Sequence, residues 1–201
     1  LRRRCRIYNR SNLKMAIDNN NSTTPINEKD YAATPAWFMQ ALKNWRGFVP
    51  ELDVCAQEQT AKARAYYCLA DGLDGLALPW ASLNWCNPPF SDVEPWIEKA
   101  MLEAERGNTT YMIFPDNPET AYCRASFLMA SEIFHMPFRM RYTRPDGSEF
   151  RDSNGAKASP KFATRLVIFA PNRKTPRPSV DYWDPRLYLD GVKIKTGAAK
   201  K

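Results

Sequence analysis

The chain has 201 residues, of which 44% are hydrophobic and 25% are charged, and this composition is sufficient for one domain with its own core. No stretch approaches the ~20 apolar residues of a membrane-spanning helix, and the five cysteines form no C-x-x-C pair, so we expect no membrane span, zinc site or disulfide framework. The net charge of +7 is unevenly distributed. Residues 1–14 carry 6 basic and no acidic side chains, residues 15–134 carry 8 basic and 16 acidic side chains, and residues 135–201 carry 15 basic and 6 acidic side chains.

Composition and charge divide the chain into three parts. Residues 1–30 are polar, basic at the start and Asn-rich, and we expect a flexible tail there. Residues 31–172 should form the folded domain, and residues 173–201 a basic C-terminal extension. No apolar stretch follows the Arg-rich start, so it does not resemble a signal peptide and we expect a cytoplasmic protein. The basic segments indicate a polyanionic partner, although solvated tails have the same composition.

The expected elements alternate between strands and helices along most of the chain. Thr34-Pro35 has the N-cap and first-turn residues of a helix that Gly47 ends. Apolar residues at helical spacing predict another helix over 93–104, followed by Gly107. The other expected elements are, in order, strand 49–56, helix 58–69, strand 82–86, strand 109–114 ended by Pro115, helix 118–130, and strands 132–136, 138–142 and 165–169. This order predicts an α/β fold with a parallel sheet and an antiparallel edge.

Asn87-Pro88-Pro89-Phe90, directly after strand 82–86, is the most informative stretch of the sequence. Consecutive prolines cannot continue a strand, because they lack the N–H group that the ladder requires. The chain must therefore leave the sheet as a rigid loop, with an amide at its start and an aromatic ring at its end. Open α/β sheets bind ligands at such loops. An amide oxygen and a carbonyl can accept hydrogen bonds from an amino group of a base, and the ring can stack on it; an ordinary turn is the alternative.

Two acidic residues lie at a spacing that is typical of nucleoside binding. Asp53 lies where strand 49–56 runs into its loop, and Asp71 lies 18 residues later, where an acidic side chain can bind ribose hydroxyls. Asp71-Gly72 is equally typical of a turn. No G-x-G pattern is present, which argues against a pyrophosphate-bearing dinucleotide.

The single histidine excludes several mechanisms. His135 has no second histidine or Cys cluster with which to form a metal site, and no Ser-His-Asp arrangement is indicated. We interpret His135 as structural and expect a reaction that needs no strong base. Asp116, at the end of strand 109–114, is a candidate helix cap. Among the tryptophans, Trp37 is the one expected near a cofactor.

In this order and spacing, the motifs resemble those of the phage-type DNA N-6-adenine methyltransferase family, the Dam-like enzymes. The resemblance covers about residues 34–170 and is carried by Thr34-Pro35-Ala36-Trp37-Phe38, Leu52-Asp53-Val54-Cys55-Ala56, Asp71-Gly72-Leu73, Trp85-Cys86-Asn87-Pro88-Pro89-Phe90-Ser91 and Phe114-Pro115-Asp116. It implies a Rossmann-like class I methyltransferase fold, with a mainly parallel seven-stranded sheet and an antiparallel C-terminal hairpin. Residues 31–172 would then be the methyltransferase domain, encoded by a phage or prophage.

The resemblance also implies the roles of individual residues. S-adenosylmethionine would be the cofactor, double-stranded DNA the partner, and no metal would be required. Asn87 and the Pro88 carbonyl would hold the adenine amino group while Phe90 stacks on the ring. The implied sets are catalytic Asn87, Pro88, Pro89 and Phe90; cofactor-binding Thr34, Pro35, Trp37, Asp53, Cys55, Ala56, Asp71, Gly72 and Leu73; and DNA-binding Arg139, Arg141, Arg144 and Lys161.

Two alternatives to DNA adenine methylation remain open from the sequence. The same chemistry could act on another amino group, namely RNA adenine, cytosine N4 or a glutamine amide of a protein. The basic C-terminal half disfavours a protein substrate. A non-catalytic DNA-binding protein on a decayed methyltransferase scaffold is the second alternative. The target sequence and the oligomeric state do not follow from the sequence.

Overall fold

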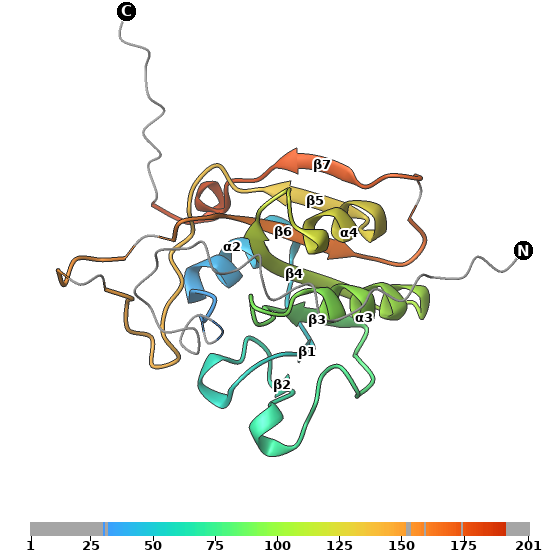
Figure 1. Cartoon of the computed structure of the whole chain (residues 1–201), viewed down its shortest axis with the longest axis horizontal. Coiled ribbons are helices and arrows are strands. Elements are labelled where there is room, and N and C mark those ends of the chain that lie inside the picture. Colours follow the sequence, from blue (N-terminus) through green and yellow to red (C-terminus); the bar gives the residue numbers. More distant parts are fainter. Residues whose placement is uncertain (1–29, 31, 152–153, 159, 174, 192–201) are drawn as a thin grey trace, which may run out of the picture.

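The computed structural model describes residues 30, 32–151, 154–158, 160–173 and 175–191 (Figure 1). The tail expected over residues 1–30 lies outside the described residues, except for Asp30. A seven-stranded sheet with the order β2-β1-β3-β4-β6-β5-β7 forms the centre of the molecule. The strands are β1 (Leu52–Asp53), β2 (Ala65–Tyr66), β3 (Leu83–Cys86), β4 (Thr109–Asp116), β5 (Glu132–His135), β6 (Ala163–Phe169) and β7 (Ser179–Tyr182).

The sheet is mostly parallel, as predicted, but the expected antiparallel edge is wrong: the antiparallel strand lies inside the sheet, because β7 pairs in parallel with β5 and forms that edge. Strands β2, β1, β3 and β4 pair in parallel, and β5 pairs in parallel with β7. Only β6 runs in the opposite direction, and it is inserted between β4 and β5, with antiparallel pairing to both. The carboxyl ends of β1, β3, β4 and β5 therefore lie at one edge of the sheet, where open α/β sheets place their ligand-binding loops.

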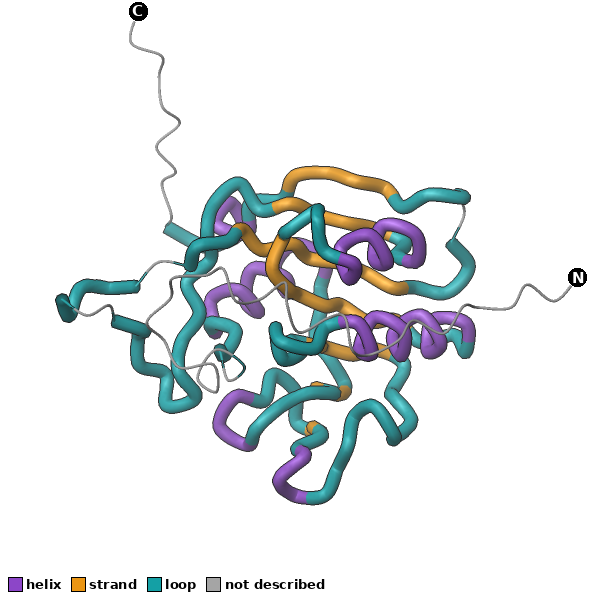
Figure 2. Tube along the Cα trace, in the orientation of Figure 1, coloured by secondary structure: helices purple, strands orange, loops and turns teal. Residues whose placement is uncertain are grey.

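Helices cover both faces of the sheet (Figure 2). Helix α2 (Ala36–Arg46) covers one face, and α3 (Glu94–Glu105) and α4 (Ala121–Met129) cover the other. Alternate residues of the strands point to opposite faces, so that Trp85 packs with α2 while its neighbour Cys86 packs with α3. No helix in the described part of the chain is long and apolar enough to cross a membrane.

The helix predicted over residues 58–69 is absent, although its residues have good helix propensity. The segment forms a 3-10 turn (Glu58–Thr60), strand β2 and a second 3-10 turn (Leu69–Asp71). Its backbone is engaged by β1 instead: the N–H of Lys62 donates to the Asp53 carboxylate, and the N–H of Tyr67 donates to the Asp53 carbonyl. Tertiary hydrogen bonds therefore override local propensity here.

Several other boundaries differ from the sequence-based expectations. The strand predicted over residues 138–142 is absent, because β6 and β7 already pair with the two sides of β5. This segment instead packs Met140 and Tyr142 into the core. Strand β4 continues through Pro115 to Asp116. Thr34 does not cap α2, whose N-cap is Pro35. Strand β7 was not predicted, and part of the expected C-terminal extension therefore belongs to the sheet.

Candidate active site

The Asn87-Pro88-Pro89-Phe90 loop leaves the sheet at the carboxyl end of β3. The last two residues of β3, Trp85 and Cys86, are fully buried, and they fix the position from which the loop starts. Strand β3 lies between β1 and β4, and the register pairs Trp85 with Asp53 of β1. The loop and the end of β1 are consequently neighbours at the same edge of the sheet. Pro88 is buried, and the other loop residues are half-buried.

The Asn87 amide is held in one orientation. Its Nδ2 donates a hydrogen bond to the main-chain oxygen of Ala32 at 2.7 Å. Its Oδ1 is buried and has no hydrogen-bond partner among the described residues. Buried polar atoms in native proteins are nearly always paired, so an open acceptor at a strand end needs an explanation. A bound donor, such as an amino group, would satisfy this oxygen.

Phe90 belongs to an aromatic cluster with two residues from distant parts of the chain. Its ring makes edge-to-face contacts with Tyr142 (centroids 5.3 Å apart) and Phe162 (5.7 Å apart). Tyr142 is buried, its hydroxyl lies 3.1 Å from the Thr164 hydroxyl, and burial raises the pKa of its phenol. Neighbouring rings that contact Phe90 edge-on restrict how it can turn. This support could not be predicted from the sequence, because Tyr142 and Phe162 follow the loop by more than 50 residues.

Asp53 organises the loop that follows β1. It is 2% exposed, and its carboxylate accepts hydrogen bonds from the N–H groups of Lys62 (2.9 Å) and Cys55 (3.3 Å). Burial raises the pKa of Asp53 to about 6, and the two N–H donors offset part of that rise. Both carboxylate oxygens are therefore used within the protein. Asp53 lies at the predicted place, where it shapes the loop of Cys55 and Ala56.

The turn after β2 closes tightly over the end of β1. A Cβ atom on Gly75 would lie 1.9 Å from the main-chain oxygen of Val54, so only glycine allows this approach. The indole of Trp80 donates to the Gly75 carbonyl at 2.7 Å. Asp71, Gly72 and Leu73 lie earlier in the same turn and are exposed. These three residues are thus on the surface, between β2 and Gly75.

The start of α2 lies against the Asn87 loop. Thr34 and Pro35 are buried and follow Ala32 by two and three residues. The carbonyl of Ala32 accepts the hydrogen bond from Asn87. The Thr34 hydroxyl is buried without a partner among the described residues, a second open polar atom on this side of the loop. Trp37, in the first turn of α2, is half-buried, and its ring lies 6.3 Å from that of Phe138.

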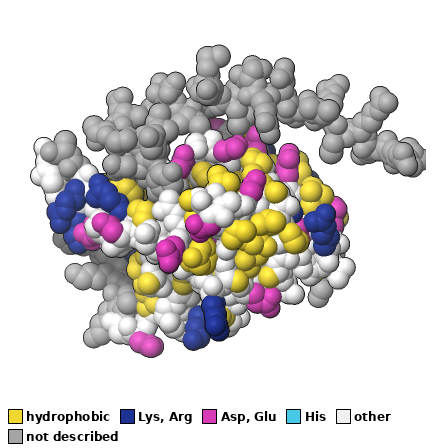
Figure 3. All heavy atoms as spheres, turned by 90° about the horizontal axis from the view of Figure 1, so that it is seen from below, with side chains coloured by type: hydrophobic (Ala, Val, Ile, Leu, Met, Phe, Trp, Pro, Cys, Tyr) yellow, Lys and Arg dark blue, Asp and Glu magenta, His cyan; other side chains and the backbone are white. Residues whose placement is uncertain are grey.

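The four predicted DNA-binding residues lie in the connection between β5 and β6. Arg139, Arg141 and Lys161 are exposed, whereas Arg144 is half-buried over the Phe150 ring and donates to the Glu149 carbonyl. This connection protrudes from the body of the molecule (Figure 1). Figure 3 shows basic side chains at the end where it protrudes, whereas acidic and hydrophobic side chains dominate the middle of the same face.

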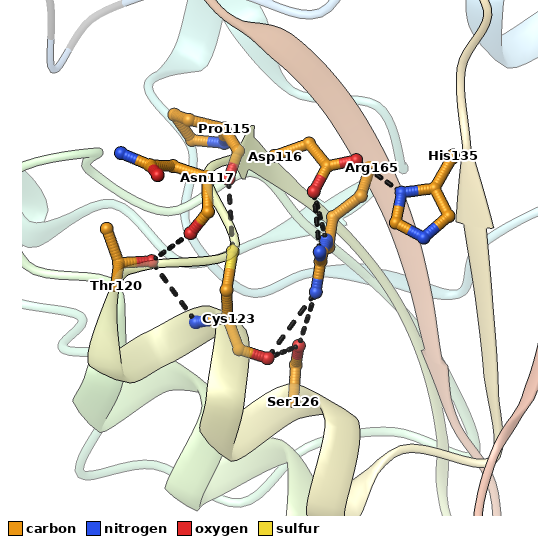
Figure 4. A network of polar contacts seen from close by, with 8 residues as sticks. All are labelled: Pro115, Asp116, Asn117, Thr120, Cys123, Ser126, His135 and Arg165. Carbon is orange, nitrogen blue, oxygen red and sulfur yellow. Dashed lines mark hydrogen bonds and ion pairs between the residues drawn. The ribbon is translucent and has the colours of Figure 1, made fainter.

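Asp116 and His135 form a polar network with Arg165 and Ser126 (Figure 4). Asp116 pairs with the buried guanidinium of Arg165 at 2.5 Å and with Nδ1 of His135. Arg165 also donates to the Ser126 hydroxyl of α4. Asp116 is therefore not a helix cap; Thr120 caps α4. Strands β4 and β6 separate β3 from β5, which places His135 about 14 Å from the Asn87 loop at the usual strand spacing.

The described residues do not favour a thiol nucleophile at this edge of the sheet, and they do not form a metal site. Burial raises the pKa of the Cys55 and Cys86 thiols, so neither is a ready thiolate. The part of the chain that the structure describes contains no group of three or more His, Cys, Asp or Glu side chains placed to hold a metal ion.

The fold and this site define an α/β protein whose rigid loop, at the carboxyl edge of a parallel sheet, offers a fixed amide acceptor to a ligand. A family model described as DNA N-6-adenine-methyltransferase (Dam) matches residues 21–186, and the chain belongs to this family. A DNA N-6-adenine-methyltransferase from Haemophilus phage HP1 (strain HP1c1) is 26% identical over 153 residues, which are 75% of this chain and 84% of that protein. Family membership confirms the prediction of a DNA adenine-N6 methyltransferase.

Proposed function

We propose that the protein transfers a methyl group from S-adenosylmethionine to the N6 amino group of adenine in double-stranded DNA, with Asn87 as the main acceptor for that amino group. The observation that carries this proposal is the buried Oδ1 of Asn87, which has no partner among the described residues while Nδ2 is held by Ala32. An oxygen fixed in this way accepts one N–H of an amino group without reorganising during the reaction.

The loop also offers a second acceptor. The Pro89 carbonyl already accepts the N–H of Asp92 at 3.1 Å, so we assign the second amino hydrogen to the carbonyl of Pro88. Two acceptors in the plane of the amino hydrogens draw the nitrogen lone pair out of conjugation with the ring. Phe90, held by Tyr142 and Phe162, would stack on the adenine. A base within a duplex is out of reach, so the target must turn out of the helix before it meets Phe90.

The residues around the loop fit the cofactor. The end of β1 with Cys55 and Ala56 lies beside the Asn87 loop, and the Thr34 hydroxyl next to it has no partner among the described residues. We assign the cofactor to this edge, between Thr34-Pro35 and the loop after β1, with Asp71, Gly72 and Leu73 at its nucleoside end. When bound, S-adenosylmethionine supplies an electrophilic methyl group, so the protein needs no nucleophile of its own.

No strong base is needed for the methyl transfer. The methylated amino group loses a proton afterwards, and water can accept it. The single histidine supports this view, because His135 is engaged by Asp116 and lies three strands away from the loop. We assign the phosphate contacts to Arg139, Arg141, Arg144 and Lys161, in the protruding connection beside the site.

Transfer of tritiated methyl groups from S-adenosylmethionine to duplex DNA tests the proposal. The full-length protein should label adenine, and Asn87→Ala should lower the rate by about 10²–10³-fold, the usual cost of removing one fixed polar contact to the reacting group. Binding of the cofactor and of DNA should remain close to that of the unmodified protein, because Ala removes the acceptor and leaves both prolines in place.

Asn117→Ala is the matched control, since Asn117 is an exposed amide just after β4 at the same edge of the sheet, and its rate should equal that of the unmodified protein. Label that enters only RNA or protein would contradict the DNA assignment. Full activity of Asn87→Ala would contradict the role of the amide. Failure to bind S-adenosylmethionine in calorimetry would favour the non-catalytic alternative.

A further inference from the structure

The catalytic loop is held from outside the sheet by a segment that precedes α2. We call this segment the strap, and it consists of Asp30 and residues 32–34. The Asp30 carboxylate accepts two hydrogen bonds from Ser91, one from its N–H (3.1 Å) and one from its hydroxyl (2.7 Å). Two residues further along, the Ala32 carbonyl accepts the bond from Asn87. The strap therefore binds both ends of the Asn87–Ser91 loop.

The strap is itself anchored on its other side. Ala33 forms a two-way backbone bridge with Thr143, with N–O distances of 2.8 and 3.0 Å. Ala33 is 5% exposed and Thr34 is 2% exposed, so both are packed into the body of the protein. Thr143 directly follows Tyr142, the aromatic neighbour of Phe90. A segment fixed in this way can transmit its position to the loop.

The Asn87 amide needs such a support. The terminal torsion of an Asn side chain has a broad, two-fold preference, so the amide is free to turn unless its partners select one orientation. Turned by half a revolution, the amide would present N–H groups to the substrate in place of the oxygen. The Ala32 carbonyl excludes that orientation, and the Asp30–Ser91 pair keeps the loop at the distance from the strap that this bond requires.

We propose that Asp30 is a positioning residue: through Ser91 it holds the catalytic loop against the strap and keeps the Asn87 oxygen facing the amino group of the substrate. This inference rests on the proposed function, because it assigns a support to the same acceptor. In this proposal Asp30 acts through Ser91, whose N–H and hydroxyl it binds, and not by a contact of its own with the substrate or the cofactor. Its removal should therefore affect the reaction step more than the binding of either.

The test compares Asp30→Ala with Asp30→Asn and Asp92→Ala. Asn at position 30 can still accept the N–H of Ser91 and can donate to its hydroxyl, so it should restore most of the activity. Asp92 is an exposed carboxylate next to Ser91 and serves as the matched control. Single-turnover methylation of duplex DNA should be about tenfold slower in Asp30→Ala, a loss typical of a displaced reacting group, with dissociation constants for DNA and cofactor within about twofold of the unmodified protein.

Hydrogen exchange at the Ser91 amide gives a readout that does not depend on catalysis. This amide should exchange about tenfold faster in Asp30→Ala, since it loses its acceptor, and at the unmodified rate in Asp92→Ala. An unchanged methylation rate in Asp30→Ala, or a loss that only follows weaker cofactor binding or a smaller folded fraction, would overturn the proposal. If the unmodified protein fails to methylate DNA, the proposed function fails, and Ser91 exchange still decides whether Asp30 holds the loop.

Discussion

The stability of the protein should depend on pH through Asp53, and Asp53→Asn isolates this dependence. The carboxyl is buried at the end of β1, and burial raises its pKa from 3.8 to about 6. Only well below its unfolded pKa of 3.8 is Asp53 protonated in both the folded and the unfolded chain, so that it contributes no pH dependence there. As the pH rises towards 6, the unfolded chain ionises first, and the folded chain binds more protons. The free energy of unfolding therefore falls as the pH rises through this range.

The expected size follows from the two pKa values. A difference between 3.8 and about 6 corresponds to about 3 kcal/mol, which is lost in full by pH 7. An Asn side chain at position 53 cannot ionise, so the free energy of unfolding of Asp53→Asn does not fall with pH for this reason. The amide of this variant directs an N–H towards the N–H of Lys62 or of Cys55. This mismatch should lower the free energy of unfolding by the same amount at every pH. The pH dependence, and not the absolute stability, is the diagnostic quantity.

Urea unfolding of both proteins between pH 4 and pH 7.5 measures this quantity directly. The free energy of unfolding of the unmodified protein, minus that of Asp53→Asn, should decrease by about 2.5 kcal/mol across the range, because the unfolded chain is already partly ionised at pH 4. Asp71→Asn removes an exposed carboxylate from the neighbouring turn and should follow the unmodified protein, because that group stays hydrated in both states. A difference between the unmodified protein and Asp53→Asn that stays constant with pH would refute the reasoning.

Three further predictions concern packing, a buried ion pair and DNA binding. Gly75→Ala should destabilise the fold by about 3 kcal/mol in urea unfolding, since its Cβ would lie 1.9 Å from a main-chain oxygen at the end of β1. Arg165→Leu should cost about 3–5 kcal/mol because it leaves the Asp116 carboxylate without its buried partner. Arg46→Ala, which breaks a partly exposed pair, should cost about 1 kcal/mol or less, and equal losses would contradict this ranking. Lys161→Ala should reduce the slope of log K against log salt for DNA binding by about 1, and an unchanged slope would exclude a phosphate contact.

The loop of residues 87–91 shows how much of the structure the local sequence predicts. The prolines at 88 and 89 dictate the end of β3, and the apolar spacing of residues 93–104 dictates the helix that follows, as α3 (Glu94–Glu105) confirms. These features depend on backbone geometry and on periodicity, which neighbouring residues determine by themselves. The place of the loop at the carboxyl edge of a mostly parallel sheet followed from the same alternation of elements.

Long-range contacts decided what the sequence could not. Residues 58–69 have the propensity of a helix, but hydrogen bonds to Asp53 draw them into β2 and its turns. Asn87 receives its orientation from Ala32, 55 positions away, and Ser91 is bound by Asp30, 61 positions away. Neither Asp30 nor Ala32 belongs to a recognisable motif. By itself, the sequence determined which residues form the loop, because that is local geometry; only the tertiary structure decided which atom of the Asn87 amide is bound by Ala32, because that partner is distant in the chain.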